Sequence, residues 1–481
     1  MESKHAFKQI NQEINRVFDL AGHPGKVAIV ALDYAKETHM ALICDGEGRS
    51  LKAPFEVKNS PAGLRYLRKQ IESSCQRFAI KPGHVIIGGE DCGSFSLNFV
   101  HALGQNGYLA IGVNARAAQL QRENFQASTD KLDLLGIAKM LMDRRGATRS
   151  KAIGRERMLR NVTRHRDDLV RTKTALRNRI HSLVDQLFPG FLDEAKSGIP
   201  PFSQGSLWLM SDRFSPRHIQ RRSSKVLIRE LTKRGLKQPV EKAHRLSAWA
   251  HDVIEAPPEL VGTLQSSLGN EIKLYEGIIV CIVQIDKEIA LLLAATQGAL
   301  LTTMKGTGIT LAAGFTAEIG PIADQPSLRR LTSYAGIVPR VKQTGGPESE
   351  ARHSSVSPRC NRILKNVVVQ CGNQIGLHGP DELKEDHGRR TANGQHADFG
   401  MARRYIRIAT FLMRYNQAYL PQALRDHGSM DEMRSYYEKQ WPIWRKKWLA
   451  AGALQEAFAP ENPLGQWREC IEAIYDIELP I

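Results

Sequence analysis

The sequence predicts an α/β domain followed by a long, mostly helical region, so that the fold class is α/β plus α. Two observations lead to this prediction. Short apolar runs separated by turn residues fill residues 26–148, whereas helical patterns with few breakers follow from residue 149. Alternating strand and helix patterns are typical of an α/β domain. At 481 residues the chain is also too long for one hydrophobic core.

The elements of the first domain are predicted in order. Residues 1–25 form a polar helix that ends at the turn GHPG, and three strands follow in KVAIVALDYA, THMALICD and SLKAPFEVKN. A helix begins at Ser60–Pro61, because proline suits the first helical position. A strand then follows in VIIGGE and a helix in SFSLNFVHALGQNG. A further strand follows in YLAIGVNA, and the last helix in DKLDLLGIAKMLMDRRG. Three antiparallel-type strands followed by α-β-α-β-α is the order of a ribonuclease-H-like domain.

Four carboxylates fall at the ends of these predicted elements. Two end apolar strands, and two lie one turn apart on the last helix, where residues three apart share a face. Mg²⁺ prefers oxygen ligands, and two such ions about 4 Å apart can hold both reacting oxygens of a phosphodiester. A single carboxylate is more often a solvated surface group, but four in one coherent pattern favour a metal centre for Mg²⁺ or Mn²⁺. The members of this carboxylate cluster are Asp33, Glu90, Asp130 and Asp133.

The charge of the chain points to a polyanionic partner. The net charge is +17, and phosphate neutralisation by Lys and Arg releases counterions. Thirteen Lys and Arg against three acids lie between Arg144 and Arg179, and eleven against two lie between Arg213 and Arg245. Solvated helical faces would show the same pattern. Because the two stretches offer only Phe214 as an aromatic, contact with a nucleic acid backbone is favoured over base readout.

An apolar stripe at residues 260–295 fits either a coiled-coil arm or dimer seam, or a core helix. Further on, residues 376–400 are expected to form an exposed loop. The Trp-rich tail after it is expected to contribute core or contact residues.

Seven scattered cysteines without a CxxC pair fit a reduced, cytoplasmic protein. The N-terminus has no apolar signal core, and no apolar run is long enough to span a membrane.

A second candidate site follows residue 300. The turn at Gly306 and Gly308 either aims backbone N–H groups at a phosphate or simply joins two helices. Thr344 precedes two glycines within a basic segment, and a hydroxyl among cations is what attack on a phosphodiester needs, although a polar loop is the more common role. The cations that could hold a phosphate there are Arg340, Lys342, Arg352, Arg359, Arg362 and Lys365.

Several motifs resemble, in the right order, those of the DEDD transposases, the family of bacterial insertion sequence one-hundred-ten and of the Piv DNA invertases. ALDYAKETH is similar to GIDxAKxxH, GGEDCG to the second acidic motif, and STDKLDLLGIAKML to KTDxxDAxxLA. MKGTGITLAAGFTAEIG resembles PGIGxxTAxxLLAEIG, while YAGIVPRVKQTGG and CNRILKN resemble AGLxPxxxxSGG and GNxxLR. RTKTALRNRIHSLVDQLFPGF resembles the helical linker of the family.

The resemblance implies a RuvC-like domain whose carboxylate cluster binds metal, and a transposase domain whose hydroxyl nucleophile becomes joined to a DNA end. The family's nucleophilic serine aligns with Thr344, and Ser354, Ser355 and Ser357 are the alternatives. Lys36, in the first motif, joins the cations expected to bind nucleic acid. The resemblance also implies donor and target DNA, a non-coding guide (bridge) RNA, and a homo-oligomer, either a dimer or a tetramer.

The sequence therefore predicts a DNA transposase or site-specific recombinase of an insertion sequence. A structure-selective RuvC-like nuclease needs the same carboxylates, and a catalytically retired nucleic-acid-binding protein needs only the basic helices. The predicted parts are an N-terminal helix (1–25), a ribonuclease-H/RuvC-like DEDD domain (26–148), a basic helical or coiled-coil linker (149–298), a mostly helical transposase domain (299–424) and a helical tail (425–481).

Overall fold

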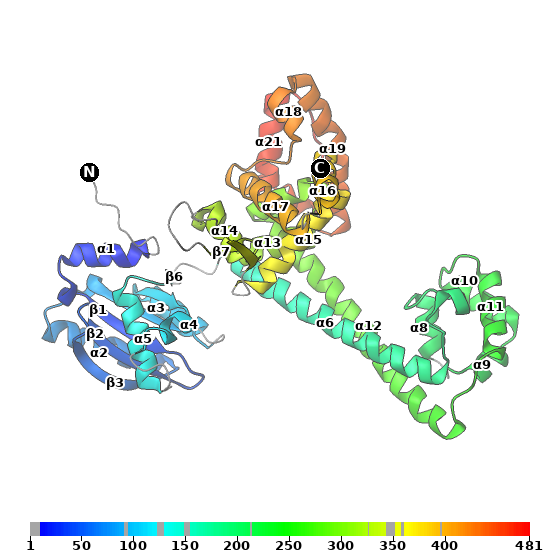
Figure 1. Cartoon of the computed structure of the whole chain (residues 1–481), viewed down its shortest axis with the longest axis horizontal. Coiled ribbons are helices and arrows are strands. Elements are labelled where there is room, and N and C mark those ends of the chain that lie inside the picture. The colour runs from blue at the N-terminus through cyan, green and yellow to red at the C-terminus, as the bar shows by residue number, and fades with distance from the viewer. Residues whose placement is uncertain are drawn as a thin grey trace. The chain divides into compact units, whose positions relative to one another are not determined.

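The computed structural model describes residues 10–90, 95–122, 129–148, 154–211, 214–325, 327–342, 352–356, 360–394 and 397–481. The chain divides into two compact units, Met1–Ile153 and Gly154–Ile481 (Figure 1). The first unit contains a six-stranded sheet, and the second is dominated by helices. Over the described ranges, no helix is both long and apolar enough to cross a membrane.

The sheet of the first unit has the strand order β3-β2-β1-β4-β5-β6. The first three strands pair antiparallel, β1 pairs parallel with β4, and β4 pairs parallel with β5. The strands follow one another along the chain as predicted, and the short antiparallel β6 is an unpredicted addition. The strands are β1 (Ala28–Asp33), β2 (Thr38–Asp45), β3 (Ser50–Lys58), β4 (Val85–Glu90), β5 (Leu109–Val113) and β6 (Ala147–Thr148).

Helices cover both faces of the sheet. The central strand β1 is apolar along most of its length, so its side chains are buried on both faces. Val30 and Leu32 pack on one side with residues of α2 and α3, whereas Ile29 and Ala31 pack on the other with α1, α4 and α5. A strand buried on both faces shows a continuous apolar run instead of alternation. The helices are α1 (Gln12–Ala21), α2 (Pro61–Arg77), α3 (Leu97–Gln105), α4 (Ala115–Gln119) and α5 (Asp130–Met142), with 3-10 turns η1 (Pro24–Lys26) and η2 (Pro82–His84).

Local sequence signals set the ends of these helices. The Ser60 hydroxyl accepts a hydrogen bond from the backbone N of Gly63 (3.2 Å), and Pro61 is the first residue of α2. Helix α1 ends at Gly22, whose φ of 70° suits glycine. The predicted helix starts and stops are confirmed at both positions.

Two glycines allow α5 to lie close to its neighbours. A Cβ atom on Gly88 of β4 would lie 2.6 Å from the Leu141 side chain of α5, and one on Gly136 of α5 would lie 2.4 Å from the carbonyl oxygen of Ala118. Close-packed interiors cannot absorb such overlaps without movement. The two glycines therefore help to fix the distance between α5 and the strand ends.

We expect Gly136→Ala to destabilise the first unit by about 1–3 kcal/mol, the cost of overpacking. In an open helix the change would instead stabilise by up to about 1 kcal/mol, but here the added methyl group meets a backbone carbonyl. Gly269→Ala is the matched control, because a Cβ on Gly269 of α12 (Pro258–Ala294) meets no atom within 4 Å. In urea unfolding, the change in the free energy of unfolding relative to wild type should have opposite signs for the two variants. A stabilised Gly136→Ala protein would show that α5 can move away from α4.

In the second unit, two long helices, α6 (Arg155–Leu187) and α12, pack along each other (Figure 1). The apolar stripe predicted on α12 divides between two environments. Ile289 is buried and Ile285 packs against the core, whereas Leu274 and Cys281 are exposed. Part of the stripe is therefore a core face within the chain. A coiled-coil arm or dimer seam formed by the rest stays a prediction.

Between α6 and α12 the chain forms a helical module with its own core. Phe214, Leu227 and Leu246 of this module pack with Leu176 and Ile180 of α6, and with the first half of α12. We call residues 188–257 the tip module. Its helices are α7 (Glu194–Ser197), α8 (Gln204–Ser211), α9 (Pro216–Gln220), α10 (Ser224–Lys233) and α11 (Pro239–His251).

A separate core joins the other ends of α6 and α12 to the C-terminal helices. Trp441, Trp444, Trp448 and Trp467 of the tail are buried in it, which confirms their predicted role. The elements are η3 (Gln297–Thr303), α13 (Ile309–Ile319), η4 (Ile322–Asp324), α14 (Leu328–Tyr334), β7 (Pro339–Lys342), β8 (Arg352–Val356), α15 (Arg362–His378), α16 (Asp381–Ala392), α17 (Ala397–Arg414), α18 (Gln422–His427), α19 (Met430–Ala450), α20 (Leu454–Ala457) and α21 (Pro463–Tyr475).

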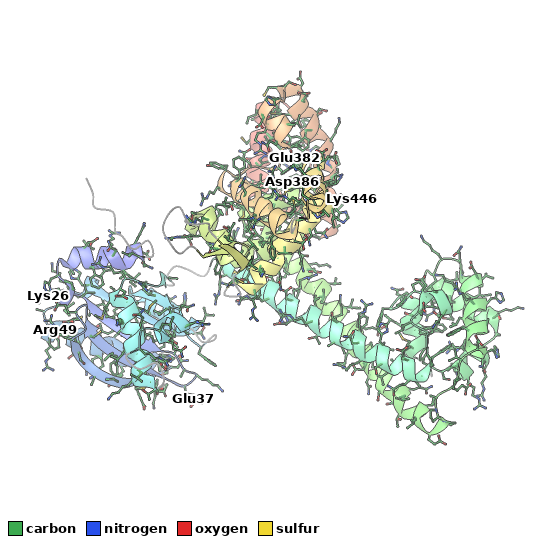
Figure 2. The ribbon with its side chains drawn as sticks, in the orientation of Figure 1. Lys26, Glu37, Arg49, Glu382, Asp386 and Lys446 are labelled. Atoms are coloured by element: carbon green, nitrogen blue, oxygen red, sulfur yellow. The ribbon has the colours of Figure 1, made fainter. Side chains whose placement is uncertain are left out.

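The prediction of an exposed loop at residues 376–400 is wrong, because helices occupy most of this segment: α16 fills its middle, and α15 and α17 reach into its two ends. Its polar composition suggested a loop. However, Asp381 and Glu382 lie in the first turn and basic residues lie in the last, an arrangement that the helix dipole favours. Leu383 is buried against the core, and Glu382 (Figure 2) accepts a hydrogen bond from the Tyr419 hydroxyl at 2.5 Å.

Candidate active site

The predicted carboxylate ligands come from three elements that meet in the first unit. β1 and β4 run parallel, and Asp33 is paired with Glu90 in their register, so both strands end in a carboxylate at the same edge. α5 packs against both strands. Figure 2 marks the two ends of this unit: Lys26 and Arg49 lie near the start of β1, and Glu37, four residues after Asp33, lies at the opposite end.

The first turn of α5 supplies the other two carboxylates. The Thr129 hydroxyl caps the helix by accepting a hydrogen bond from the backbone N of Leu132 (3.4 Å). Leu134 and Ile137 are fully buried against the sheet. Because residues four apart share a helix face, Asp130 and Asp133 lie on the same side of α5 as these two core residues.

Charge interactions indicate that Asp130 and Asp133 of α5 lie close to Asp33. Burial is the largest cause of a raised pKa at Asp33, and the negative charges of Asp133 and Asp130 raise it further. Charge interactions weaken with distance, so the α5 carboxylates lie near the end of β1. Glu90 is 7% exposed. Such a group of mutually repelling carboxylates favours the approach of a cation.

Arg122 supplies positive charge that the sequence interpretation missed. Its guanidinium forms an ion pair with Asp133, and the two side chains are only 9% and 18% exposed. The charge of Arg122 also lowers the pKa of Asp33, against the effects that raise it. Arg122 follows α4 in a stretch without a recognisable motif, so only the fold could place it beside the carboxylates.

By its chemistry the carboxylate cluster suits a hard divalent cation, since all its donor atoms are oxygens. Within the described part of the chain, however, no group of three or more His, Cys, Asp and Glu side chains has the arrangement needed to hold a metal ion. The Arg122 guanidinium engages an oxygen of Asp133 in this structure.

Buried His39 fixes the loop that follows Asp33. Its Nδ1 atom accepts a hydrogen bond from the backbone N of Ala35 at 3.1 Å. The ring packs edge-on against Phe99 and Tyr34, with centroid distances of 4.6 and 5.4 Å. Burial lowers the pKa of His39, which keeps the ring neutral. The histidine of the ALDYAKETH motif is thus a positioning residue.

The exposed side chain of Lys36 projects from this same loop. The Lys36 carbonyl accepts a hydrogen bond from the Asn59 side chain at 3.1 Å, which ties the loop to the end of β3. Lys36 lies three residues after Asp33, and its side chain is accessible, as a contact with nucleic acid would require. That role stays a prediction.

The predicted second site lies around the hairpin of β7 and β8 in the second unit. The backbone of Arg340 lies opposite that of Ser354, and Lys342 lies opposite Arg352. The predicted nucleophile Thr344 lies outside the described residues, as do Ser357 and Arg359. Ser355 belongs to β8. The roles of all these residues stay predictions.

A buried ionic network anchors the chain just after this hairpin. Glu318 of α13 accepts hydrogen bonds from Arg160 (3.1 Å) and Arg164 (2.8 Å) of α6, and from the Asn361 side chain (2.7 Å). Burial alone would raise the pKa of Glu318, but these hydrogen bonds and charges outweigh it and lower the pKa. Asn361 also caps α15 by accepting from the backbone N of Leu364. The network thus fixes the start of α15 relative to α6.

The cations predicted at the start of α15 differ in their surroundings. Arg362 is exposed at the first position of the helix, whereas Lys365 is half-buried with its Nζ atom 5.4 Å from the Phe399 ring centroid. Arg362 is accordingly the more accessible to a phosphate. Local sequence does not distinguish Arg362 from Lys365. It also gives Glu318 no predicted role, although this residue lies in the AEIG motif.

A mixed sheet with carboxylates at the ends of two adjacent parallel strands, followed by a mostly helical unit, fits the class of ribonuclease-H-like transposases. Residues 30–189 match a family model described as a transposase, of the DEDD type of IS110, and residues 298–383 match one described as the transposase IS116/IS110/IS902 family. The "Insertion element IS116 uncharacterized 44.8 kDa protein" of Streptomyces clavuligerus is 22% identical over 400 residues, which are 82% of this chain and 96% of the relative. The chain belongs to the IS110 family of insertion-sequence transposases.

Proposed function

We propose that this transposase cleaves and rejoins DNA strands with divalent metal ions bound at the carboxylate cluster and with Thr344 as a covalent nucleophile. The parallel register that pairs Asp33 with Glu90, next to the first turn of α5, carries this proposal. Mg²⁺ suits the all-oxygen donor set, and Mn²⁺ is the alternative.

At the carboxylate cluster, a bound metal ion would stabilise the charge that develops on the reacting oxygens of a phosphodiester. The protein holds the ligands on rigid elements: two adjacent strand ends and one helix start. Arg122 would release Asp133 when the ion enters. Lys36, exposed beside the cluster, would hold the DNA backbone.

At the second site, the Thr344 hydroxyl attacks a DNA phosphorus atom. A bond forms between Oγ1 and phosphorus, the bond to a deoxyribose oxygen breaks, and that oxygen takes up a proton as the threonine loses one. The resulting phosphodiester to the protein is reversed when another DNA hydroxyl attacks it. The cations that neutralise the phosphate during these steps are the six that the sequence predicts: Arg340, Lys342, Arg352, Arg359, Arg362 and Lys365.

The proposal includes an element-encoded guide RNA and a homo-oligomer, dimer or tetramer. The net charge of +17 exceeds what a few phosphate contacts at one cleavage site would use. The exposed Leu274 and Cys281 of α12 leave an apolar face on which a second copy could pack.

The test is to incubate the protein with Mg²⁺, the terminal DNA of its element and flank-derived RNA, and to look for a protein–DNA adduct that survives denaturation. We expect the adduct. Cleavage without an adduct would favour a structure-selective nuclease, and binding without metal-dependent turnover would favour a nucleic-acid-binding protein.

We expect Arg122→Gln to destabilise the metal-free first unit and to strengthen its response to metal. Removal of one partner of a mostly buried ion pair costs up to about 3–5 kcal/mol, and each 1 kcal/mol lowers the melting temperature of a domain of this size by about 2–4 °C. In EDTA the variant should melt lower than wild type, and Mn²⁺ should restore more of its stability, because the ion no longer competes with a guanidinium.

Arg49→Gln is the control for this experiment, because Arg49 (labelled in Figure 2) also belongs to the first unit. It pairs with an aspartate there, Asp45, at 2.6 Å. Its melting temperature should respond to Mn²⁺ as that of wild type does. An equal metal response in both variants and wild type would show that Arg122 does not compete with the ion.

A further inference from the structure

The tip module carries a row of cations on the outer face of α10. Leu227 and Leu231 are fully buried against the module's core. Lys225, Arg229 and Lys233, four residues apart, lie opposite these leucines on the helix and are all exposed. Arg221 and Lys237 continue the exposed basic surface before and after α10. We call the residues Arg221, Lys225, Arg229, Lys233 and Lys237 the basic tip row.

The row has little internal charge compensation. Among the described residues, Lys225 and Lys233 form no ion pair, and Arg229 has only a 3.4 Å contact with the adjacent Glu230. That carboxylate is engaged more closely by Arg234, at 2.6 Å. Like charges four residues apart destabilise a helix by a few tenths of a kcal/mol per pair. The row therefore does not serve the stability of α10, and a polyanion would relieve its repulsion.

The aromatic side chains of the tip module favour a duplex over a single strand. Recognition of single strands uses aromatic rings on which bases stack. In the module, the Trp208 ring already has the guanidinium groups of Arg222 and Arg234 over it, at 4.9 and 4.2 Å. Lys196 lies similarly over Trp249, at 5.7 Å. The cations of the row are spaced about 6 Å apart along the helix. In the described structure no aromatic ring beside them is open to stacking with a base. This arrangement suits contact with the phosphates of a duplex backbone.

The tip module is also separate from the parts that match the family. It falls between the matched ranges 30–189 and 298–383, apart from its first two residues. Its core is distinct from that of the C-terminal helices. Figure 1 shows α10 within this module, at the end of the paired helices α6 and α12. The positive charge of the tip module is not explained by a role in the carboxylate cluster or in the Thr344 segment.

We propose that the basic tip row binds the phosphate backbone of duplex DNA, independently of base sequence. The inference rests on the proposed function only in taking DNA as the substrate of the protein. It adds a contact surface on the second unit that involves neither of the two predicted reaction centres.

The test measures how the affinity of the full chain for a random-sequence DNA duplex depends on salt. Each lost phosphate contact makes the slope of log K against log salt concentration less steep by about 0.9. For the variant Lys225→Gln, Arg229→Gln, Lys233→Gln we expect a slope smaller by about 1–3. The charge-preserving variant Lys225→Arg, Lys233→Arg should keep the wild-type slope.

The matched control removes three exposed cations from α19, by Lys439→Gln, Arg445→Gln and Lys446→Gln. Figure 2 labels Lys446. It changes the net charge equally and should leave the slope unchanged. A tip variant with the wild-type slope, or a control with the same reduction, would overturn the inference, as would a tip variant that weakens binding only to single-stranded RNA. Circular dichroism melting of each variant verifies the fold.

Asp130→Ala separates this inference from the proposed function, because it should lose strand cleavage and keep the wild-type salt slope. A normal slope in the tip variant together with intact cleavage would reject the basic tip row alone. A reduced slope in a protein that never cleaves DNA would leave the row supported and reject the proposed chemistry.

Discussion

Asp130→Ala should reduce Mg²⁺-dependent strand cleavage by at least about 10³-fold, which corresponds to about 4 kcal/mol of transition-state stabilisation. The expectation follows from the position of Asp130 in the first turn of α5, where its charge reaches Asp33. Without this carboxylate the cluster loses an oxygen donor, and a metal ion would be held less firmly beside the reacting phosphate.

The same substitution should leave the fold nearly as stable as before. Asp130 repels Asp33, and removal of that repulsion offsets the loss of a favourable interaction with the helix dipole, each effect being worth about 1 kcal/mol or less. Melting temperature and DNA affinity should therefore change little while cleavage is lost. This combination distinguishes a metal ligand from a residue that only supports the structure.

Asp143→Ala is the control, because Asp143 is exposed at the C-terminal end of the same helix. Cleavage by this variant should match wild type, measured as single-turnover rates on terminal DNA. Unimpaired cleavage by Asp130→Ala would rule out the assignment of the carboxylate cluster. Equal losses in both variants would indicate damage to α5 instead of the loss of a ligand.

Thr344→Ala should abolish the denaturation-resistant protein–DNA adduct, because alanine has no oxygen to bond to phosphorus. Thr344→Ser should retain or increase adduct formation, since a primary alcohol is less hindered than a secondary one. Binding of DNA should persist in both, because the cations around the predicted loop remain. The yield of adduct on a denaturing gel measures the effect.

Ser357→Ala is the parallel variant for this experiment, because Ser357 is an alternative nucleophile in the same segment. It should form the adduct normally. An adduct that persists in Thr344→Ala but disappears in Ser357→Ala would transfer the role to the serine. Peptide mapping of the nuclease-trimmed adduct would then identify the modified residue directly.

Much of the first unit follows from local sequence. The apolar run before Asp33 predicted β1, because a strand buried on both faces needs no alternation. Ser60 and Gly22 marked helix ends through capping that depends only on neighbouring residues. The sequence of α16 also contains local helix signals, but its polar composition led to the prediction of a loop. There the acidic first turn and buried Leu383 make a helix where a loop was predicted.

The sequence by itself determined the order of the elements in the first unit, the four carboxylates at their ends and the excess of positive charge, because these depend on residue type and spacing. Only the tertiary structure decided that Arg122 pairs with Asp133, that Glu318 holds the start of α15 and that part of the α12 stripe is exposed. Arg122 and Glu318 meet partners at least ten residues away in sequence, and spacing along the chain gives no information about which distant side chains the fold brings together.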